Sequence, residues 1–150
     1  MKNIFDPAVA SEVIGRIRSL GPEAQPLWGK MTVAQMFAHC CVPYEMAFEE
    51  IHPKPGRVTR FFLRTFVKAK VVNEKPYPRN TPTAPAFKVT PDKDFIQERD
   101  RLIGYVEQTR DLGQDHFEGL ESPSFGPLSK EEWNNLFYKH LDHHLTQFGA

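Results

Sequence analysis

Two histidines near the end of the sequence have the spacing of a divalent-metal site. His140 and His144 lie four residues apart within residues 138–144. Because an α-helix advances about 100° per residue, side chains at this spacing project from one face and can bind a single ion with both rings. Large apolar residues recur on the same face: Trp133, Leu136, Phe137, Leu141 and Phe148. The pattern therefore predicts a helix whose two imidazoles point into the protein core.

A third histidine, His39, lies in residues 33–42, a segment so apolar that its helix is expected to be mostly enclosed by neighbours. Three inward-facing histidines on two helices could complete one site with three nitrogen ligands. The alternative is that each histidine is a neutral core residue whose ring nitrogens bond nearby backbone or side chains. His39 favours the metal site, because three buried imidazoles without partners would be costly.

Polar residues on the histidine faces are candidates for hydrogen bonds that orient the rings. Gln35 and Gln147 each lie on the histidine side of their helix, where they could hold a ring or a bound water; their alternative role is to form a polar end of the bundle. His143 falls at the rim of the buried face, where it could orient a ligand ring or contact solvent. No clear general base accompanies the three candidate ligands, so the catalytic residues are left open.

The helix that carries His39 has a recognisable start. Thr32 and Gln35 form a capping box, and the helical pattern continues to about residue 50. Pro43 falls inside this helix and lacks the amide that would bond the carbonyl of His39. A kink or a loosened turn is therefore expected at the histidine, either as an ordinary packing feature or as a functional one.

Three further long helices are predicted from their ends. Asp6 and Pro7 read as N-cap and first residue of a helix that ends at Gly21-Pro22. Thr90-Pro91 is expected to start another helix that runs to Gly113. Ser129 and Glu132 form a second capping box, which opens the helix with His140 and His144.

A shorter amphipathic helix is predicted over residues 57–70. One side carries Val58, Phe62, Phe66 and Ala69, and the other carries Arg57, Arg60, Arg64 and Lys68. The four basic residues are candidates for binding an anion, although a solvated helix face is the commoner role of such a stripe. Residues 71–91 contain five prolines, which predicts an extended loop lying over the helices.

These elements predict an all-α fold. Helices that are apolar on one side must bury those sides against each other, and a four-helix bundle is the simplest arrangement that does so. The sequence thus predicts a four-helix bundle with one extra short helix and a long Pro-rich loop. Its 150 residues suit one domain, residues 1–150.

Composition narrows the classes of partner. Lys plus Arg and Asp plus Glu both number 19, so the formal net charge of +0 provides no field that would attract nucleic acid. The sequence shows neither a signal peptide nor a membrane span, so no membrane association is expected. Cys40 and Cys41 are neighbours in a helical segment, where a disulfide between them is unfavourable. A reducing cytoplasm is the expected location.

With these features in place, the chain resembles the DinB-like superfamily of metal-binding four-helix bundles, and most closely a branch of unknown function. The resemblance covers nearly the full length and rests on three blocks: residues 28–32 leading to Ala38-His39, residues 82–88, and residues 125–133 running into residues 138–149. It implies a metal site in which the second helix supplies His39 and the last helix supplies His140 and His144. Relatives have a histidine before the Phe-Gly pair, where this chain has Ser122-Pro123-Ser124.

The resemblance also implies a chemistry. In several relatives the metal, often zinc or nickel, serves transfer or isomerisation reactions that use a low-molecular-weight thiol such as bacillithiol or mycothiol. Dimers are common among such relatives, so a homodimer is expected. The leading hypothesis is accordingly a metal-dependent thiol S-transferase or hydrolase acting on a small-molecule substrate. The basic stripe could hold carboxylates of the thiol, although a solvated helix face is the commoner role.

Two alternatives remain open at this point. One is a non-catalytic stress-response protein in which a metal or a small ligand stabilises the bundle. The other is nucleic-acid binding, which the single basic stripe favours and the neutral net charge opposes.

Overall fold

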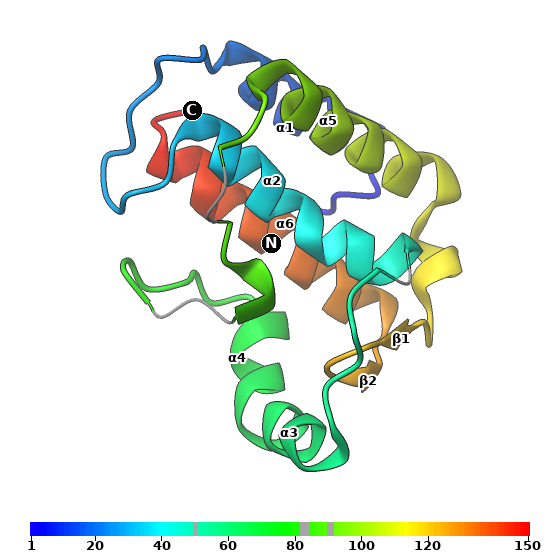
Figure 1. Ribbon diagram of the computed structural model, residues 1–150. Helices are drawn as coiled ribbons and strands as arrows, with labels where there is room; N and C mark the ends of the chain where they lie inside the picture. The colour runs from blue at the N-terminus through cyan, green and yellow to red at the C-terminus, as the bar shows by residue number, and fades with distance from the viewer. Residues whose placement is uncertain (50, 82–84, 90–91) are drawn as a thin grey trace.

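The computed structural model describes residues 1–49, 51–81, 85–89 and 92–150, and within them the predicted all-α fold is confirmed (Figure 1). The four long helices are α1 (Pro7–Ser19), α2 (Val33–Phe48), α5 (Phe95–Leu112) and α6 (Lys130–Gln147). A helical arm consists of α3 (Arg57–Phe62), the π-helical turn η1 (Leu63–Val67) and α4 (Lys68–Val72). The remaining elements are the 3₁₀ turns η2 (Pro85–Phe87) and η3 (Gln114–Phe117), and a hairpin of β1 (Glu121–Ser122) and β2 (Gly126–Pro127). The sequence predicted no strands. Each strand of this hairpin has two residues, which is too short to show an alternation of apolar and polar residues.

The predicted helix starts are confirmed for three of the four long helices: Asp6 with Pro7, Thr32 with Gln35, and Ser129 with Glu132. In each, the side-chain oxygen of the cap accepts hydrogen bonds from backbone N–H groups of the first turn, which the helix itself leaves unsatisfied. Helix α5 begins later than predicted. Asp94 is its N-cap and accepts a 2.7 Å bond from the amide of Gln97, while the predicted start, Thr90-Pro91, lies outside the described residues.

The four long helices enclose one core. Helices α1 and α2 each pack against both α5 and α6. The largest fully buried side chains of this core are Trp133, Tyr44, Phe37, Phe117 and Phe137. Helix α2 continues through Pro43 to Phe48, so the missing amide does not end it. Among the described helices, none combines the length and apolar composition that a membrane span requires.

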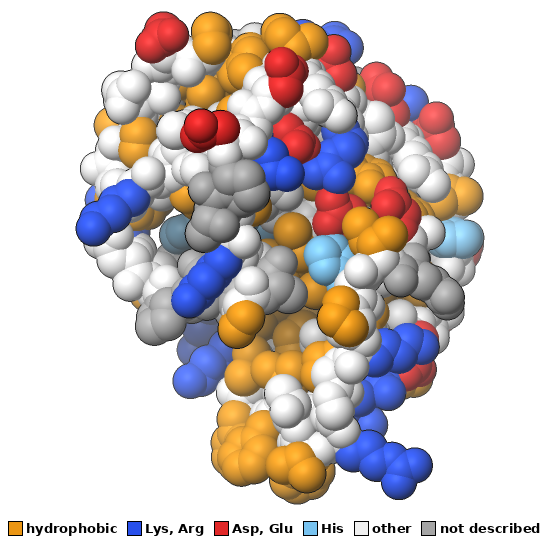
Figure 2. Space-filling model, viewed as in Figure 1, with side chains coloured by type: hydrophobic (Ala, Val, Ile, Leu, Met, Phe, Trp, Pro, Cys, Tyr) orange, Lys and Arg blue, Asp and Glu red, His pale blue; other side chains and the backbone are white. Residues whose placement is uncertain are grey.

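The helix predicted over residues 57–70 is present as the arm, but the expected burial of its apolar side is not found. Its apolar side, which includes Val58, Phe62 and Phe66, is exposed rather than packed on the bundle, and Figure 2 shows hydrophobic side chains gathered where the arm projects. The arm also contains a π-helical turn that the sequence did not predict. Lys68 donates its amide to the carbonyl of Leu63, five residues back, and this wider turn changes the register of the residues that follow.

The basic side of the arm faces the bundle instead. Arg60 forms an ion pair with Glu121 of β1, and Lys68 forms one of 2.9 Å with Glu132 in the first turn of α6. At the far end of the arm Lys139 of α6 donates to the carbonyls of Lys70 (3.1 Å) and Asn73 (2.5 Å). These contacts fix the arm by its polar side, which a helical wheel of residues 57–70 alone could not reveal.

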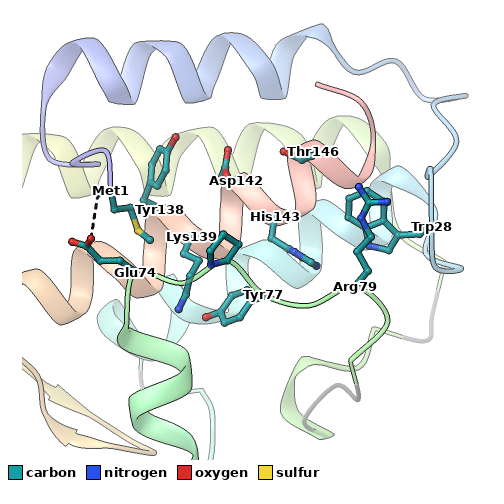
Figure 3. A pocket seen from close by; sticks show the side chains of 11 residues that line it. Met1, Trp28, Glu74, Tyr77, Arg79, Tyr138, Lys139, Asp142, His143 and Thr146 are labelled. Carbon is teal, nitrogen blue, oxygen red and sulfur yellow. Dashed lines mark ion pairs between the residues drawn. The ribbon is translucent and has the colours of Figure 1, made fainter.

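The predicted Pro-rich loop lies over the bundle where it is described. Residues 74–79 run beside α6, with Tyr77 under the ammonium of Lys139 and Arg79 over the ring of Trp28 (Figure 3). The turn η2 then brings Phe87 to the middle of α2. The loop thereby forms one wall of the region around the histidines.

Candidate metal centre

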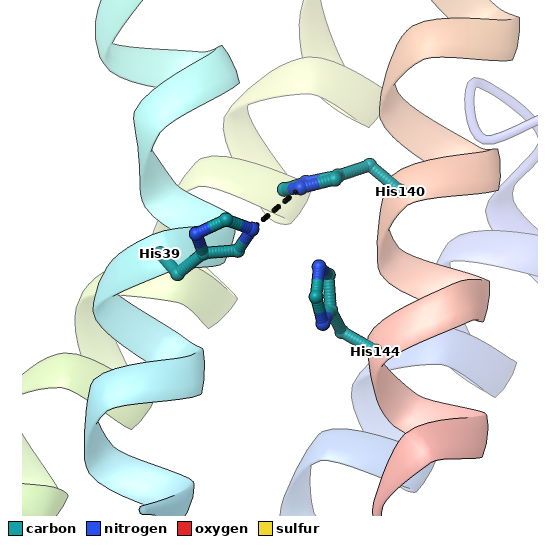
Figure 4. Close-up of side chains that lie close together, drawn as sticks. All are labelled: His39, His140 and His144. Carbon is teal, nitrogen blue, oxygen red and sulfur yellow. Dashed lines mark hydrogen bonds between the residues drawn. The ribbon is translucent and has the colours of Figure 1, made fainter. Parts of the chain in front are cut away.

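The three predicted histidines converge between α2 and α6 (Figure 4). One ring nitrogen from each of His39, His140 and His144 lies within 4.8 Å of the others. The residues are 4%, 8% and 8% exposed, as the apolar faces of their helices predicted. Because α2 and α6 pack side by side, a histidine in the middle of α2 meets the His-x-x-x-His pair of α6.

Hydrogen bonds determine which nitrogen of two rings carries the proton. His39 Nδ1 lies 2.7 Å from the carbonyl oxygen of Phe87, and because a carbonyl only accepts, Nδ1 is the protonated nitrogen. His144 Nδ1 lies 2.8 Å from Oε1 of Gln147, whose amide orientation is set by the 2.6 Å bond from its Nε2 to the carbonyl of Trp28. Both rings therefore present a bare Nε2 to the centre of the cluster.

The third ring cannot satisfy both bare nitrogens. His140 Nε2 lies 2.9 Å from His39 Nε2, so a proton on His140 Nε2 serves His39 alone. Within the described part of the chain His144 Nε2 has no donor, and His140 Nδ1 is buried without any partner. Buried polar atoms normally have partners, so the protein's own hydrogen bonds leave this cluster incomplete.

The donor set fits a divalent transition-metal ion. Zn–N bonds of about 2.0–2.1 Å place two ligating nitrogens roughly 3 Å apart, and His39 and His140 already have this separation. In metal sites the second ring nitrogen of a ligand histidine usually donates to an oxygen. His39 and His144 have this arrangement through Phe87 and Gln147.

Burial keeps the three rings neutral, which is the form that binds metal. Desolvation lowers the pKa of His39 and holds the pKa of His140 well below its ordinary value. It lowers the pKa of His144 to about 3, although the hydrogen bond with Gln147 acts in the opposite direction. Neighbouring histidines depress each pKa further, because two imidazolium ions would repel at this distance.

A pocket of about 210 Å³ adjoins the cluster along α6 (Figure 3). Its lining includes Trp28, Tyr77, Arg79, Lys139 and His143. The His143 ring lies between pocket and cluster, with ring centroids 5.7 Å from Trp28, 5.8 Å from Tyr77 and 5.0 Å from His144. His143 thus occupies the half-buried rim position that its place on the helix predicted.

The two glutamines predicted to orient the histidine rings make different hydrogen bonds. Gln147 bonds His144, as a ring-orienting residue would. Gln35 does not: its Oε1 accepts the Thr32 amide at 3.0 Å and closes the capping box. The hydrogen bond described for the Gln35 side chain is thus the one that caps α2, and it leaves this oxygen unavailable to a histidine ring.

The structure limits which residues of the basic stripe are available to an anion. Arg60 and Lys68 are paired with Glu121 and Glu132, and Arg64 lies beside the backbone of Gly126. Arg57 and Arg64, both exposed, have no ion pair among the described residues. Carboxylates from distant parts of the sequence thus neutralise two of the four basic residues, Arg60 and Lys68.

Sequence reasoning missed the carbonyl of Phe87 and the carbonyl of Trp28 as parts of the site. A backbone carbonyl leaves no mark in the residue type. The sequence blocks around Trp28-Gly29 and residues 82–88 contributed to the family resemblance, but the resemblance assigned no role to them.

Gly29 gives a test of how the Trp28 turn supports the site. Its φ is +84°, a conformation that favours glycine, and a Cβ there would lie 2.6 Å from Gln147 Nε2. Gly29→Ala is expected to lower the free energy of unfolding by about 1–3 kcal/mol, measured by urea denaturation. Gly15→Ala is the matched control, because a Cβ at Gly15 in α1 meets nothing within 4 Å. Equal stability of the two variants would contradict this role of Gly29.

Fold and site together define a class: an all-α protein with a buried three-histidine cluster that could hold a metal ion. The chain belongs to the DUF1569 family, described as a protein of unknown function, which matches residues 7–150. No curated protein and no solved structure matches the chain.

Proposed function

We propose that this protein is a metal-dependent enzyme of the thiol S-transferase or hydrolase type, related to the DinB-like superfamily. His39, His140 and His144 would bind a divalent ion, zinc or nickel, through their Nε2 atoms. The observation that carries the proposal is that two rings are oriented by hydrogen bonds at Nδ1 so that their bare Nε2 atoms face the third ring. The order of the ligands, one on α2 and two on the last helix, is what the superfamily resemblance implies.

Three nitrogen ligands would leave at least one coordination position open. A metal bound there would lower the pKa of a coordinated thiol or water, so that the nucleophilic anion exists near neutral pH. The chain's own contribution is to keep the three rings neutral and to exclude water, since all three are more than nine-tenths buried.

The pocket beside the cluster supplies a place for the substrate. Its acidic residues Asp142 and Glu74 are engaged, with Arg16 at 2.8 Å and with the N-terminal amine at 3.7 Å. Arg79 stacks over Trp28 with its guanidinium 4.2 Å from the ring centroid, and it has no carboxylate partner among the residues described. We therefore propose that Arg79, rather than the basic stripe, binds the carboxylate of a small thiol or substrate.

The test is turnover by protein reloaded with zinc or nickel. Thiol consumption is measured with an electrophilic acceptor and bacillithiol, mycothiol or glutathione in turn, and ester hydrolysis is measured in parallel. We expect turnover with at least one thiol or ester, a loss of at least about 100-fold after chelation, and an increase in KM of about tenfold in Arg79→Ala. Arg99→Ala, on the far helix α5, is the control. A fully loaded protein without turnover on any of these would contradict the enzymatic proposal.

A second candidate is a non-catalytic metal- or small-ligand-binding stress-response protein. Two observations favour it: no carboxylate belongs to the described cluster as a general base, and the rings are nearly enclosed. Bound metal that raises the Tm without any turnover would support this candidate.

We also propose the setting in which the protein works. The balanced charge favours a small-molecule substrate over nucleic acid or an anionic membrane. The free, buried thiols of Cys40 and Cys41 favour a reducing cytoplasm. Because the four long helices share one core, residues 1–150 are proposed to form a single domain.

A further inference from the structure

The most unusual surface of the protein is the outer side of the arm. Four large apolar residues, here called the arm face, are largely exposed: Val58 (74%), Phe61 (64%), Phe62 (56%) and Phe66 (59%). The phenylalanines form a contiguous group, with ring centroids 6.3 Å apart for Phe61 and Phe62 and 5.6 Å apart for Phe62 and Phe66. Figure 2 shows this hydrophobic group at the projecting end of the molecule. Monomeric proteins rarely leave so many large apolar side chains together in water.

The arm face is directed away from its own bundle. The opposite side of the arm is held by the ion pairs of Arg60 with Glu121 and of Lys68 with Glu132. Rotating the arm to bury the phenylalanines would break both pairs and expose Val72, which is buried against the bundle. Among the described residues no segment of the chain covers this surface, which leaves it open to a partner from outside the chain.

We propose that the arm face is the contact through which two copies of this chain form a dimer. Phe62 lies midway between Val58 and Phe66, four residues from each, so the three form one apolar seam along the helix. In a two-fold dimer such a seam meets an identical seam, and the central residue lies near the symmetry axis. This inference is independent of the proposed enzymatic function.

The exposed area is sufficient for a weak dimer. An aromatic side chain buries about 150–250 Å² when enclosed, so exposed fractions of 56–64% leave roughly 100–150 Å² on each phenylalanine. With Val58, two copies would bury roughly 800–1,000 Å² from these side chains alone, close to the ~1,000 Å² expected of a specific interface. The expected affinity is therefore micromolar rather than nanomolar.

Charge favours a second copy over a lipid surface. A helix that lies on an anionic membrane carries free Lys and Arg around its apolar face. In the arm Arg60 and Lys68 are paired with Glu121 and Glu132, which leaves Arg57 and Arg64 as the residues of the stripe without an ion pair among the described residues. The whole chain has a formal net charge of +0 and so has no excess positive charge to hold it on an anionic surface. An uncharged apolar seam is complementary to itself.

The test is the molar mass of the full chain in solution, measured by light scattering from about 1 to 200 µM. We expect a concentration-dependent rise toward twice the 17.3 kDa of one chain. Phe62→Glu is expected to weaken association at least about 100-fold. Its circular dichroism should be unchanged, because Phe62 is exposed in the monomer. Ile96→Glu is the matched control, since Ile96 is 52% exposed on α5 and should leave the dimer intact.

Two results would overturn the proposal. One is a wild-type chain that stays at 17.3 kDa over the whole concentration range, whether or not it sediments with phosphatidylglycerol vesicles. The other is a Phe62→Glu variant that still dimerises like the wild type. Metal content and turnover are measured on the same samples, so failure of the dimer is distinguishable from failure of the enzymatic proposal.

Discussion

Replacing His144 by alanine is expected to remove the bound metal. Elemental analysis of wild-type protein incubated with zinc or nickel and then desalted should give about one ion per chain. In His144→Ala the content should fall to about a tenth of that or less, with an affinity loss well above the 10–100-fold seen for residues that only orient ligands. The reason is that His39 and His140 would remain as a two-nitrogen pair, 2.9 Å apart and already hydrogen-bonded to each other.

The control for this experiment is another histidine. His116 lies exposed in η3, outside the three-histidine cluster, so His116→Ala should keep the full metal content. Circular dichroism of both variants establishes that the fold is retained. If the wild type binds no ion, or if His144→Ala binds as much as the wild type, the three histidines are not a metal site. They would then be neutral core residues joined by the hydrogen bonds already described.

Most of the fold could be predicted because its determinants are local. The caps at Asp6, Thr32 and Ser129 act within one turn, so they can be read from four consecutive residues. The predicted start of α5 was too early because the sequence offers two N-cap residues, Thr90 before a proline and Asp94, and the helix begins after Asp94. The orientation of the arm depends on Glu121, 61 residues from its partner Arg60. No helical wheel contains that information.

In the candidate site, too, the features set by local sequence could be predicted and those set by distant residues could not. The pair His140 and His144 follows from helical spacing alone, and the burial of His39 follows from its apolar segment. The three histidines meet because α2 and α6 are neighbours. A four-helix bundle makes such a pairing possible but does not specify which helices are adjacent. The carbonyl of Phe87 could not be predicted, because the hydrogen bond with His39 spans 48 residues and involves no side-chain chemistry of the phenylalanine.

Chelation of the metal is expected to lower the Tm by about 10 °C at neutral pH. A ligand that binds only the folded state stabilises it by roughly 4 kcal/mol when present at about a thousand times its Kd. For a chain of this size each kcal/mol corresponds to about 2–4 °C. Differential scanning calorimetry of metal-loaded and chelated protein measures the shift, and readdition of the ion should restore the original Tm.

The shift should also depend on pH in a defined direction. In the folded, metal-free protein burial lowers the pKa of His144 from 6.5 to about 3, and it lowers those of His39 and His140 as well. Between about pH 6.5 and 3 the unfolded chain therefore binds more protons than the folded one. The free energy of unfolding must fall as the pH falls through this range, by up to about 1.4 kcal/mol per pH unit for each histidine.

Metal binding requires the same neutral rings, so protons compete with the ion and the stabilisation by metal should shrink over the same acidic range. The melting curves of loaded and chelated protein should therefore converge as the pH approaches 4 and separate fully above about pH 7. His144→Ala should show no response to the chelator at any pH. A wild-type Tm that does not change on chelation at neutral pH would contradict coupling between metal and fold at these three histidines.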